Sequence, residues 1–371
     1  MAKLVLVGAG HAHMTLMSNI TQCIEQGHSV DVIGPGERHY YSGMGPGMLG
    51  GTYSPKAISF PVQRMCEEQG ATFHLDEAVG VDPEKQHIKL ESGKEIAYDV
   101  ASFNTGSSII DDVVQPDAQD IFTVKPIEKL LEGRNRIFEL AREGRPFSIG
   151  VVGGGPAGIE VAGNAWAAAQ QAGADATVHL YHGKHFMPRV PTRVRTQSKN
   201  ILTKHGVELI GGEYVSRVDT GSVTLHDGSV HTDDIIFIAM GVRPRPLFEP
   251  SGIPHGDDGG MLVNKYLQST QYKNIFGGGD CIWYEPQPLD KVGVYAVRQN
   301  QVLNDNVMAK LNNEPLTEFA PGGDYLLIYN TGANTGVLHK FGISFNGKAA
   351  FKVKDYIDTK FIDLFKPDYD R

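Results

Sequence analysis

An α/β fold with two parallel-sheet domains, one inserted into the other, and a small C-terminal segment is predicted from three features. Apolar runs that read as strands alternate with helical spacing over most of the 371 residues. A glycine-rich turn follows a strand and opens a helix at residues 8–13, and a second does so about 145 residues later, at 153–158. This strand–turn–helix order is typical of Rossmann-like domains that bind dinucleotides.

The first round of the pattern occupies about 110 residues. Apolar spacing and turns such as Asp82-Pro83 and Ser92-Gly93 separate its elements. In order, we expect a strand at 4–7, a helix at 14–25, a strand at 29–33, a loop at 34–53, a helix at 55–69, and strands at 78–81, 87–90, 95–98 and 100–103.

The pattern then restarts, and its second round ends on Ala239-Met240-Gly241 as the first ends on Asn104-Thr105-Gly106. We interpret this as an internal duplication of about 130 residues. Its expected elements are helices at 127–142, 159–172 and 192–205 and strands at 149–152, 177–181, 212–218, 222–225 and 235–240. The first domain is therefore predicted at 1–112 and 247–320, the inserted domain at 113–246, and a C-terminal segment at 321–371.

Composition narrows the class of protein. The net charge of −9 and the lack of a basic tract argue against nucleic acid as a partner. We expect no secretory leader and no membrane span, and three widely spaced cysteines suggest a reducing compartment. A cytoplasmic protein is expected, either free or peripheral on the cytoplasmic face of the inner membrane. No metal-ligand spacing is present, so no metal site is predicted.

Two motifs point to a first dinucleotide. Gly8 and Gly10 allow a pyrophosphate to approach the backbone, with Ala12 in the helix that follows. His11 either contacts the phosphates or is an exposed residue at the helix start. His13 replaces the third glycine and is expected to loosen the contact between helix and strand. Farther on, 275–281 reads as a strand ending in Gly-Gly-Gly-Asp-Cys, where Asp280 would accept hydrogen bonds from the ribityl chain of FAD.

Two departures from common patterns bear on the chemistry. The strand at 29–33 is not followed by the usual ribose-binding acid but by Gly34-Pro35-Gly36, so backbone groups or Glu37 would take that role. The segment 40–47 has no cysteine pair, which excludes the dithiol chemistry of glutathione and thioredoxin reductases. This segment either lines a flavin or is a plain surface loop.

The second turn keeps all three glycines and predicts a nicotinamide nucleotide. Its residues are Gly153, Gly155, Pro156, Ala157 and Gly158. Glu160 either favours the helix dipole or places its carboxylate near flavin and nicotinamide. The strand at 177–181 is followed by His182-Gly183-Lys184-His185, with Arg189 beyond, where NADH sites carry an acid. This basic set fits NADPH, but solvated surface charge explains it as well, so NADH or NADPH both stay open.

Six motifs together give a family resemblance that covers nearly the whole chain: Gly-Ala-Gly-His-Ala-His at 8–13, Tyr-Ser-Gly-Met at 41–44, Asn-Thr-Gly-Ser at 104–107, Val-Lys-Pro-Ile at 124–127, Gly-Gly-Gly-Pro-Ala-Gly-Ile-Glu at 153–160, and Lys-Val-Gly-Val-Tyr-Ala-Val-Arg-Gln at 291–299. The chain resembles the FAD-dependent pyridine-nucleotide oxidoreductases that include type II NADH:quinone dehydrogenases and sulfide:quinone reductases. It is most similar to the branch sometimes fused to selenide, water dikinase. The resemblance implies a glutathione-reductase-like pair of domains.

The resemblance also implies site residues. Lys125 and the stretch 295–299 would lie near the isoalloxazine, with Glu160, Lys125 and Gln299 as catalytic candidates. The cofactor-binding candidates are Gly8, Gly10, His11, Ala12, Pro35, Arg38, Ser42, Val79, Asn104, Thr105, Gly106, Asp280, Lys291, Val294, Tyr295, Gly153, Gly155, Pro156, Ala157, Gly158, His182 and Gly241.

The predicted function is hydride transfer from NAD(P)H to FAD and electron transfer onward to a quinone or another small acceptor. Alternatives are a reductase or oxidase of sulfur or selenium species, or a flavin-binding regulatory module without turnover. At the C-terminus, Ile357, Phe361, Leu364 and Phe365 share one helical face. The neighbouring aspartates balance the lysines, so no basic surface is expected to favour anionic lipid. This face is expected to contact a membrane, the protein itself, or a second copy in a homodimer.

Overall fold

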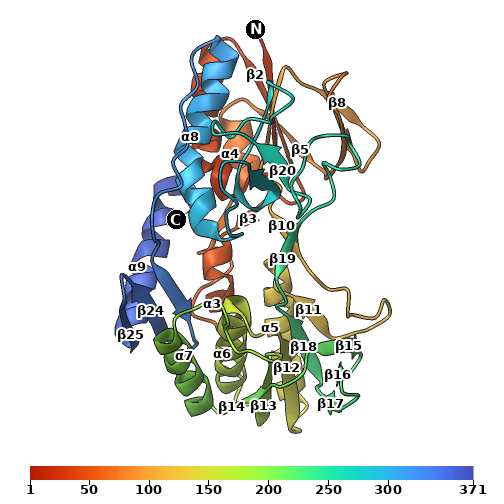
Figure 1. The fold of residues 1–371 in the computed structure, drawn as a ribbon, viewed down its shortest axis with the longest axis vertical. Helices are drawn as coiled ribbons and strands as arrows, with labels where there is room; N and C mark the ends of the chain where they lie inside the picture. Colours follow the sequence, from red (N-terminus) through yellow and green to blue (C-terminus); the bar gives the residue numbers. More distant parts are fainter. Residues whose placement is uncertain (371) are drawn as a thin grey trace.

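Each glycine-rich turn lies at the carboxyl end of the middle strand of a five-stranded sheet. The computed structural model describes residues 1–370, and Figure 1 shows the two sheets in separate lobes, one above the other. From edge to edge, the first sheet consists of β21 (Ile275–Gly277), β9 (Val100–Phe103), β1 (Lys3–Val7), β2 (Ser29–Gly34) and β5 (Thr72–Leu75). The second sheet consists of β11 (Ile121–Thr123), β18 (Ile235–Ile238), β12 (Phe147–Val152), β13 (Ala176–Tyr181) and β14 (Val207–Ile210).

All the pairings within these two sheets are parallel. β21 joins the first sheet after the chain has passed through the whole second sheet, so one lobe is inserted into the other. Four strands of each sheet follow the same order, with β9, β1, β2 and β5 matching β18, β12, β13 and β14. The fifth, edge strand differs: β21 follows the other four in the chain, whereas β11 precedes its four. The predicted α/β fold with two Rossmann-like domains is therefore confirmed.

Helices cover both sheets, and their interior-facing residues are apolar. In the first lobe they are α1 (Met14–Ser18), α2 (Ile20–Glu25), α4 (Val62–Glu68) and the long α8 (Gly293–Asn312), and in the second α5 (Glu128–Arg142), α6 (Pro156–Gln171) and α7 (Thr192–Lys204). Small sheets cap the lobes, namely β6 (Ala78–Asp82), β7 (His87–Leu90) and β8 (Glu95–Ala97) on one, β15 (Val215–Asp219), β16 (Ser222–Leu225) and β17 (Val230–Thr232) on the other, and the pair β20 (Met261–Val263) and β22 (Ile282–Tyr284).

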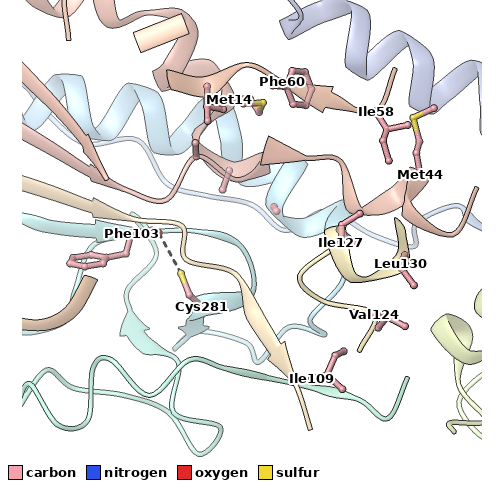
Figure 2. Packing of buried hydrophobic residues seen from close by; sticks show 14 of the residues in the cluster. Met14, Met44, Ile58, Phe60, Phe103, Ile109, Val124, Ile127, Leu130 and Cys281 are labelled. Atoms are coloured by element: carbon pink, nitrogen blue, oxygen red, sulfur yellow. Dashed lines mark hydrogen bonds between the residues drawn. The ribbon is translucent and has the colours of Figure 1, made fainter. Parts of the chain in front are cut away.

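Two connections hold the lobes together. The crossover strands β10 (Ser107–Ile109) and β19 (Val242–Pro244) pair antiparallel where the chain enters and leaves the second lobe. Nearby, the short helix α3 (Gly45–Leu49) packs against the start of α5. The contact is close, since an ideal Cβ on Gly45 would lie 3.0 Å from the Ile127 side chain. Figure 2 shows Met44, Ile127 and Leu130 gathered at this contact.

Several predicted elements differ from the structure. No strand was expected at β5 or β14, and the strand expected at 212–218 begins only at Val215, as β15. The helix expected at 14–25 is broken at Asn19, where the backbone leaves helical geometry, and it is preceded by a 3-10 turn at His11–His13. The helix expected at 55–69 is only α4, because Ser59–Phe60 (β4) pairs with His39–Tyr40 (β3) and Pro61 follows. The loop expected at 34–53 contains β3, a 3-10 turn at Ser42–Met44, and α3.

His13 was expected to loosen the contact between the first helix and its strand, but its side chain does not do so. The imidazole is fully buried, with Nδ1 2.6 Å from the Gly8 carbonyl and Nε2 2.8 Å from the Ser102 hydroxyl. Burial lowers the pKa of His13 to about 4, so the ring is neutral and can donate one hydrogen bond and accept another. Polar contacts thus replace the close packing that a third glycine allows.

The C-terminal segment is a hairpin sheet and a helix. β23 (Leu327–Asn330), β24 (Gly336–Lys340) and β25 (Ile343–Gly347) precede α9 (Lys348–Phe365), which runs along one side of both lobes in Figure 1. The inner face of α9 combines buried apolar residues (Ala350, Phe351 and Ile362) with polar contacts: Asp358 accepts from the Tyr41 hydroxyl at 3.1 Å, and Asp355 accepts from Tyr53 at 2.7 Å. The segment is therefore bonded to residues 41–53 of the first lobe.

Candidate functional site

Asn104 ties the first glycine turn to the end of β21. Its Oδ1 accepts from the Ala12 amide at 3.1 Å, and its Nδ2 donates to the Gly278 carbonyl at 2.7 Å. An ideal Cβ on Gly8, where φ is +84°, would lie 2.3 Å from the Asn104 carbonyl, and one on Gly10 would lie 2.3 Å from Asn104 Oδ1. Side chains are therefore excluded from the turn.

Lys125, Ser107 and Asp280 meet at the carboxyl end of the first sheet. Lys125 Nζ lies 2.8 Å from Asp280 Oδ2 and 2.7 Å from Ser107 Oγ, and Ser107 donates to Asp280 at 2.7 Å. Burial raises the pKa of Asp280, but the Lys125 ammonium and these hydrogen bonds outweigh it and hold the pKa below its usual value. Lys125 comes from the second lobe, so the cluster joins the two lobes.

The first turns of α8 complete this region. Gln299 is buried and its Oε1 accepts from the Gly279 amide at 2.6 Å, beside Asp280. Lys291 forms an ion pair with Asp258 at 2.9 Å and donates to the Ile282 carbonyl. Tyr295, Lys291, Asp280 and Gln299 line one cavity. Thus Lys125, Asp280 and Gln299 lie in one region of the structure. Lys291 and Tyr295 line the cavity there, and Val294 is partly buried beside Tyr295 in the first turn of α8.

His11 is not exposed, and among residues 1–370 its Nε2 has no hydrogen-bond partner. Its ring packs 4.8 Å from Tyr41, 5.5 Å from His39 and 5.8 Å from Phe361 of α9. Nε2 of His11 and Nε2 of His39 are both inaccessible and without a hydrogen-bond partner. Burial lowers the pKa of His11 to about 3 and that of His39 to about 4, so both rings are neutral. Two neutral imidazoles in edge contact therefore lie at the end of the first turn, each with an unpartnered Nε2.

Other predicted cofactor residues lie farther along the first lobe. Arg38 forms a two-pronged pair with Asp370, with Nη2 2.6 Å from Oδ2, and donates to Ser59. Pro35 is exposed just after β2, Ser42 begins the 3-10 turn, and Val79 lies half exposed in β6. None of these contacts the Lys125–Asp280 cluster through a hydrogen bond among the described residues.

The second turn is built by close backbone contacts. An ideal Cβ on Gly158 would lie 1.7 Å from the Gly153 carbonyl, and one on Gly153, where φ is +135°, would lie 2.3 Å from the Ala239 carbonyl. A Cβ on Gly155 would meet nothing within 4 Å. Pro156 and Ala157 are exposed at the start of α6, and Gly241 has φ +54° at the end of the neighbouring strand. The amino end of α6 is thus open to an anion.

Glu160 faces the C-terminal segment. Its Oε1 accepts from the Asn330 amide at 2.8 Å, and the Lys354 ammonium of α9 lies close enough to influence its titration. Burial raises the pKa of Glu160 to about 6, and Lys354 only partly offsets this. Among the described residues, no hydrogen bond joins Glu160 to Lys125 or Gln299. Catalytic candidates therefore occupy two separate places.

Sequence reasoning missed the partners of these groups. Ser107, Asn330, Lys354 and Asp358 take part in the contacts above, and Lys354 bonds both the Gly43 carbonyl at 2.8 Å and Asp358 at 2.7 Å. Each is far from its partner in sequence, except for the pair within α9. Ser107 alone had a local signal, because it belongs to the quoted Asn-Thr-Gly-Ser motif.

The Glu160 carboxyl predicts a pH effect on stability. Its pKa is higher when folded, about 6, than its ordinary value of 4.5, so its contribution is greatest at low pH and is lost as the pH rises through 6. That loss corresponds to roughly 2 kcal/mol. The difference in unfolding free energy between Glu160→Gln and the wild type, from urea titrations, is therefore expected to grow in favour of the variant between pH 4.5 and 7. A pH-independent difference would contradict this.

All three cysteines are free and buried. Cys281 follows Asp280 directly, but its thiol contacts the Phe103 and Gly278 carbonyls, at 3.5 and 3.3 Å, and burial raises its pKa (Figure 2). A raised pKa keeps the sulfur as an unreactive thiol. Among residues 1–370, no group of histidine, cysteine, aspartate and glutamate side chains is suited to hold a metal ion, and none of the helices is both long and apolar enough to cross a membrane.

Comparison with known proteins defines the class. The model of the family described as "Pyridine nucleotide-disulphide oxidoreductase" matches residues 2–301, and the chain belongs to this family. It is an FAD-dependent oxidoreductase that uses a pyridine nucleotide.

Several relatives are similar over most of the chain. Ferroptosis suppressor protein 1 of Taeniopygia guttata is 28% identical over 287 residues, which cover 72% of this chain and 71% of the relative. Type II NADH:quinone oxidoreductase of Staphylococcus saprophyticus is 23% identical over 391 aligned positions, covering 96% and 94%. The structure of NDH2 from Plasmodium falciparum in complex with NADH superposes with a TM-score of 0.80, 14% identity and 99% coverage of both chains, which shows the shared fold.

Proposed function

We propose that this chain is an NAD(P)H:quinone oxidoreductase. The observation that carries the proposal is the pair of glycine turns in duplicated sheets, with the Lys125–Ser107–Asp280 cluster joining the two lobes beside the first turn. The type II NADH:quinone oxidoreductase relative, similar over nearly the full length, supports a quinone as the acceptor. The buried, separate cysteines give no support to dithiol chemistry.

The first turn fits FAD. It forms a cradle from which Asn104 excludes any side chain at Gly8 or Gly10, and the neutral His11 offers an unused nitrogen beside it. Asp280 stays ionised at neutral pH because of Lys125, so it can accept hydrogen bonds from ribityl hydroxyls. Helix α8 begins at Gly293, and its Tyr295 and Gln299 line the same cavity as Asp280. We assign the remaining predicted residues of the first lobe to FAD on the same argument, with Arg38, Pro35 and Val79 toward the adenosine end.

The second turn is assigned to the nicotinamide nucleotide. The open space at Gly155 lets a pyrophosphate reach the amino end of α6. When bound, FAD supplies the redox chemistry, accepting a hydride from the nucleotide and passing two electrons to the acceptor. Quinone reduction also needs protons, and Glu160, with a pKa of about 6, can hold and release one near neutral pH. The Lys125 ammonium keeps Asp280 ionised and is itself a hydrogen-bond donor at the same point.

Anaerobic mixing of the purified flavoprotein with NADH, and separately with NADPH, tests this function. Rapid loss of the oxidised-flavin absorbance with either nucleotide, followed by rapid return on adding a short-chain quinone, is the expected result. Bleaching by sulfide or selenide but by neither nucleotide would favour chemistry on sulfur or selenium species. No bleaching with any donor would leave a flavin-binding module without turnover, and would refute the proposal.

We also propose that the C-terminal segment rests on a membrane surface. In α9, Asp355, Asp358 and Lys354 bond inward and Lys366 is buried, so Lys360 and Asp363 are the exposed remainder of that balanced set, and the excess of positive charge comes from Lys340, Lys348 and Lys352. The outer face, as we name this side, has the exposed residues Phe341, Ile343, Phe345, Val353, Tyr356, Ile357 and Leu364 together with Lys340, Lys348, Lys352 and Lys360. Apolar residues mixed with lysines suit an interface with anionic lipid, where quinones dissolve.

Introducing negative charge on the outer face should release the protein from vesicles. Ile343→Glu combined with Leu364→Glu removes two side chains that are 68% and 73% exposed, and we expect at least about a tenfold weaker binding to phosphatidylglycerol vesicles in sedimentation assays. Val230→Glu, which alters a residue 61% exposed in β17, is the matched control and should bind normally. Equal binding of all three proteins, or a shift from dimer to monomer in the double variant, would instead identify the face as a dimer contact or plain surface.

A further inference from the structure

We propose that the donor site recognises the 2′-phosphate of NADPH, through Lys184 and Arg189 with His185 beside them, and that Glu213 holds Lys184 when no phosphate is bound. This inference rests on the proposed function, because it names which nucleotide the second glycine turn takes.

The residue after β13, where an acid or its absence distinguishes NADH from NADPH sites, is His182 and carries no negative charge. An ideal Cβ on Gly154 would lie 2.5 Å from the Cβ of His182, so His182 directly adjoins the glycine turn at the end of β13. NADH sites place an acid here, which accepts from the ribose hydroxyls and repels a phosphate. The His182 ring instead turns onto Gly211 and lies 5.4 Å from Phe186, and burial lowers its pKa, which keeps it neutral.

The basic side chains project from this point into solvent. Gly183 has φ +65°, and an ideal Cβ there would lie 2.6 Å from the Tyr214 ring, so Tyr214 packs on the turn that presents Lys184 and His185. Lys184, His185 and Arg189 are exposed. Among the described residues, Arg189 has no ion-pair partner. Exposed basic side chains around one backbone turn provide the contacts that a doubly charged phosphate needs.

The ion pair of Lys184 is weak enough to be exchanged. Its Nζ lies 3.6 Å from Glu213 Oε1, with the side chains 53% and 35% exposed. Surface pairs of this kind contribute little to stability, because water screens them and ordering the side chains has an entropic cost. A bound 2′-phosphate, with more charge and better donor geometry, would therefore take Lys184 from Glu213. The Glu213 carboxylate thus competes with the 2′-phosphate for Lys184, and removing its charge should strengthen binding of the phosphate.

Binding of 2′,5′-ADP and of 5′-AMP to the flavin-loaded protein, measured by calorimetry at low salt, tests the proposal without turnover. The wild type is expected to bind 2′,5′-ADP at least tenfold more tightly. Lys184→Ala and Arg189→Ala should each reduce that preference severalfold, while Glu213→Gln should increase it and leave 5′-AMP unchanged. Lys204→Ala, at the far end of α7, is the matched control and should change neither affinity.

Equal affinity for the two ligands in the wild type would overturn the proposal. So would tighter 5′-AMP binding that is lost in Glu213→Gln, because Glu213 would then be the ribose-binding acid of an NADH site. The quinone-reduction assay is independent of this measurement. A protein that prefers 2′,5′-ADP but reduces no quinone refutes the proposed function alone, and a protein that reduces quinone with NADH and binds both ligands equally refutes only the nucleotide preference.

Discussion

Replacing Gly158 by alanine is expected to destabilise the second lobe and abolish nucleotide binding, while the same replacement at Gly155 spares the fold. At Gly158 the new methyl group would lie 1.7 Å from the Gly153 carbonyl, a backbone atom that cannot turn aside. α6 would have to move away from β12 and β13, and its inner residues, among them Ile159 and Ala162, are fully buried. Overpacking of this kind costs roughly 1–3 kcal/mol, and the backbone contact at Gly158 puts this variant at the upper end, about 3 kcal/mol.

At Gly155 the methyl group would meet no atom of the protein within 4 Å. The unfolding free energy of Gly155→Ala should therefore stay within about 0.5 kcal/mol of the wild type. Its methyl group would nevertheless occupy the side from which the pyrophosphate approaches, so nucleotide affinity should fall. Both variants should keep FAD, because Gly8, Gly10 and Asn104 are unchanged.

Urea unfolding, flavin content and quenching of protein fluorescence by NAD(P)H separate these effects. If Gly158→Ala unfolded at the wild-type urea concentration and bound nucleotide normally, the close contact between α6 and the turn would not matter to folding. If Gly155→Ala bound nucleotide normally, the second turn would not be the pyrophosphate site.

The duplicated fold could be predicted because its signals are local. The middle strand of each sheet ends at a glycine turn, and a helix begins within a few residues of that turn. The order of elements is therefore visible without knowing which strands pair. The second copy removed most of the ambiguity of the first. Element bounds failed where a distant partner decides them: residues 59–60 form a strand because His39 and Tyr40 lie beside them, which no local pattern indicates.

The site was predictable as a set of groups but not as a set of contacts. Asp280 and Lys125 were both identified from motifs, yet their ion pair joins residues 155 positions apart. Glu213 was not identified, because the acid near Lys184 comes from the loop after β14 and not from the end of β13. Charge counts along α9 ignore direction, and Asp355 and Asp358 point inward to tyrosines of the first lobe.

His13 shows how a departure from a motif can be compensated. The third glycine normally allows the helix to approach the strand, and its loss was expected to weaken that contact. A neutral imidazole between the Gly8 carbonyl and the Ser102 hydroxyl replaces it, and the reading from the motif alone could not include Ser102, 89 residues away. Sequence patterns thus indicate where a constraint lies better than how a given chain satisfies it.

Replacing Lys125 by methionine is expected to lower the unfolding free energy by about 3 kcal/mol and to weaken FAD binding, because a largely buried carboxylate loses its counter-ion. The side chains of Lys125 and Asp280 are 26% and 13% exposed, so water only partly screens them. The pair depresses the pKa of Asp280, so its contribution is present at neutral pH and lost as the pH falls below the ordinary value of 3.8. In Lys125→Met the pKa of Asp280 should rise, which moves acid release of FAD to higher pH.

A double-mutant cycle separates the ion pair from side-chain size. Lys125→Met with Asp280→Asn should cost less than the sum of the single changes, because neither charge is then left alone. Lys129→Met is the matched control: its pair with Glu132 is exposed, 44% and 51%, and should contribute less than about 1 kcal/mol. Flavin absorbance after gel filtration, measured from pH 4 to 8, gives the second readout. Additive single effects with unchanged flavin retention would mean that the ion pair neither couples the lobes nor supports the flavin, and the assignment of Asp280 to the ribityl chain would fall with it.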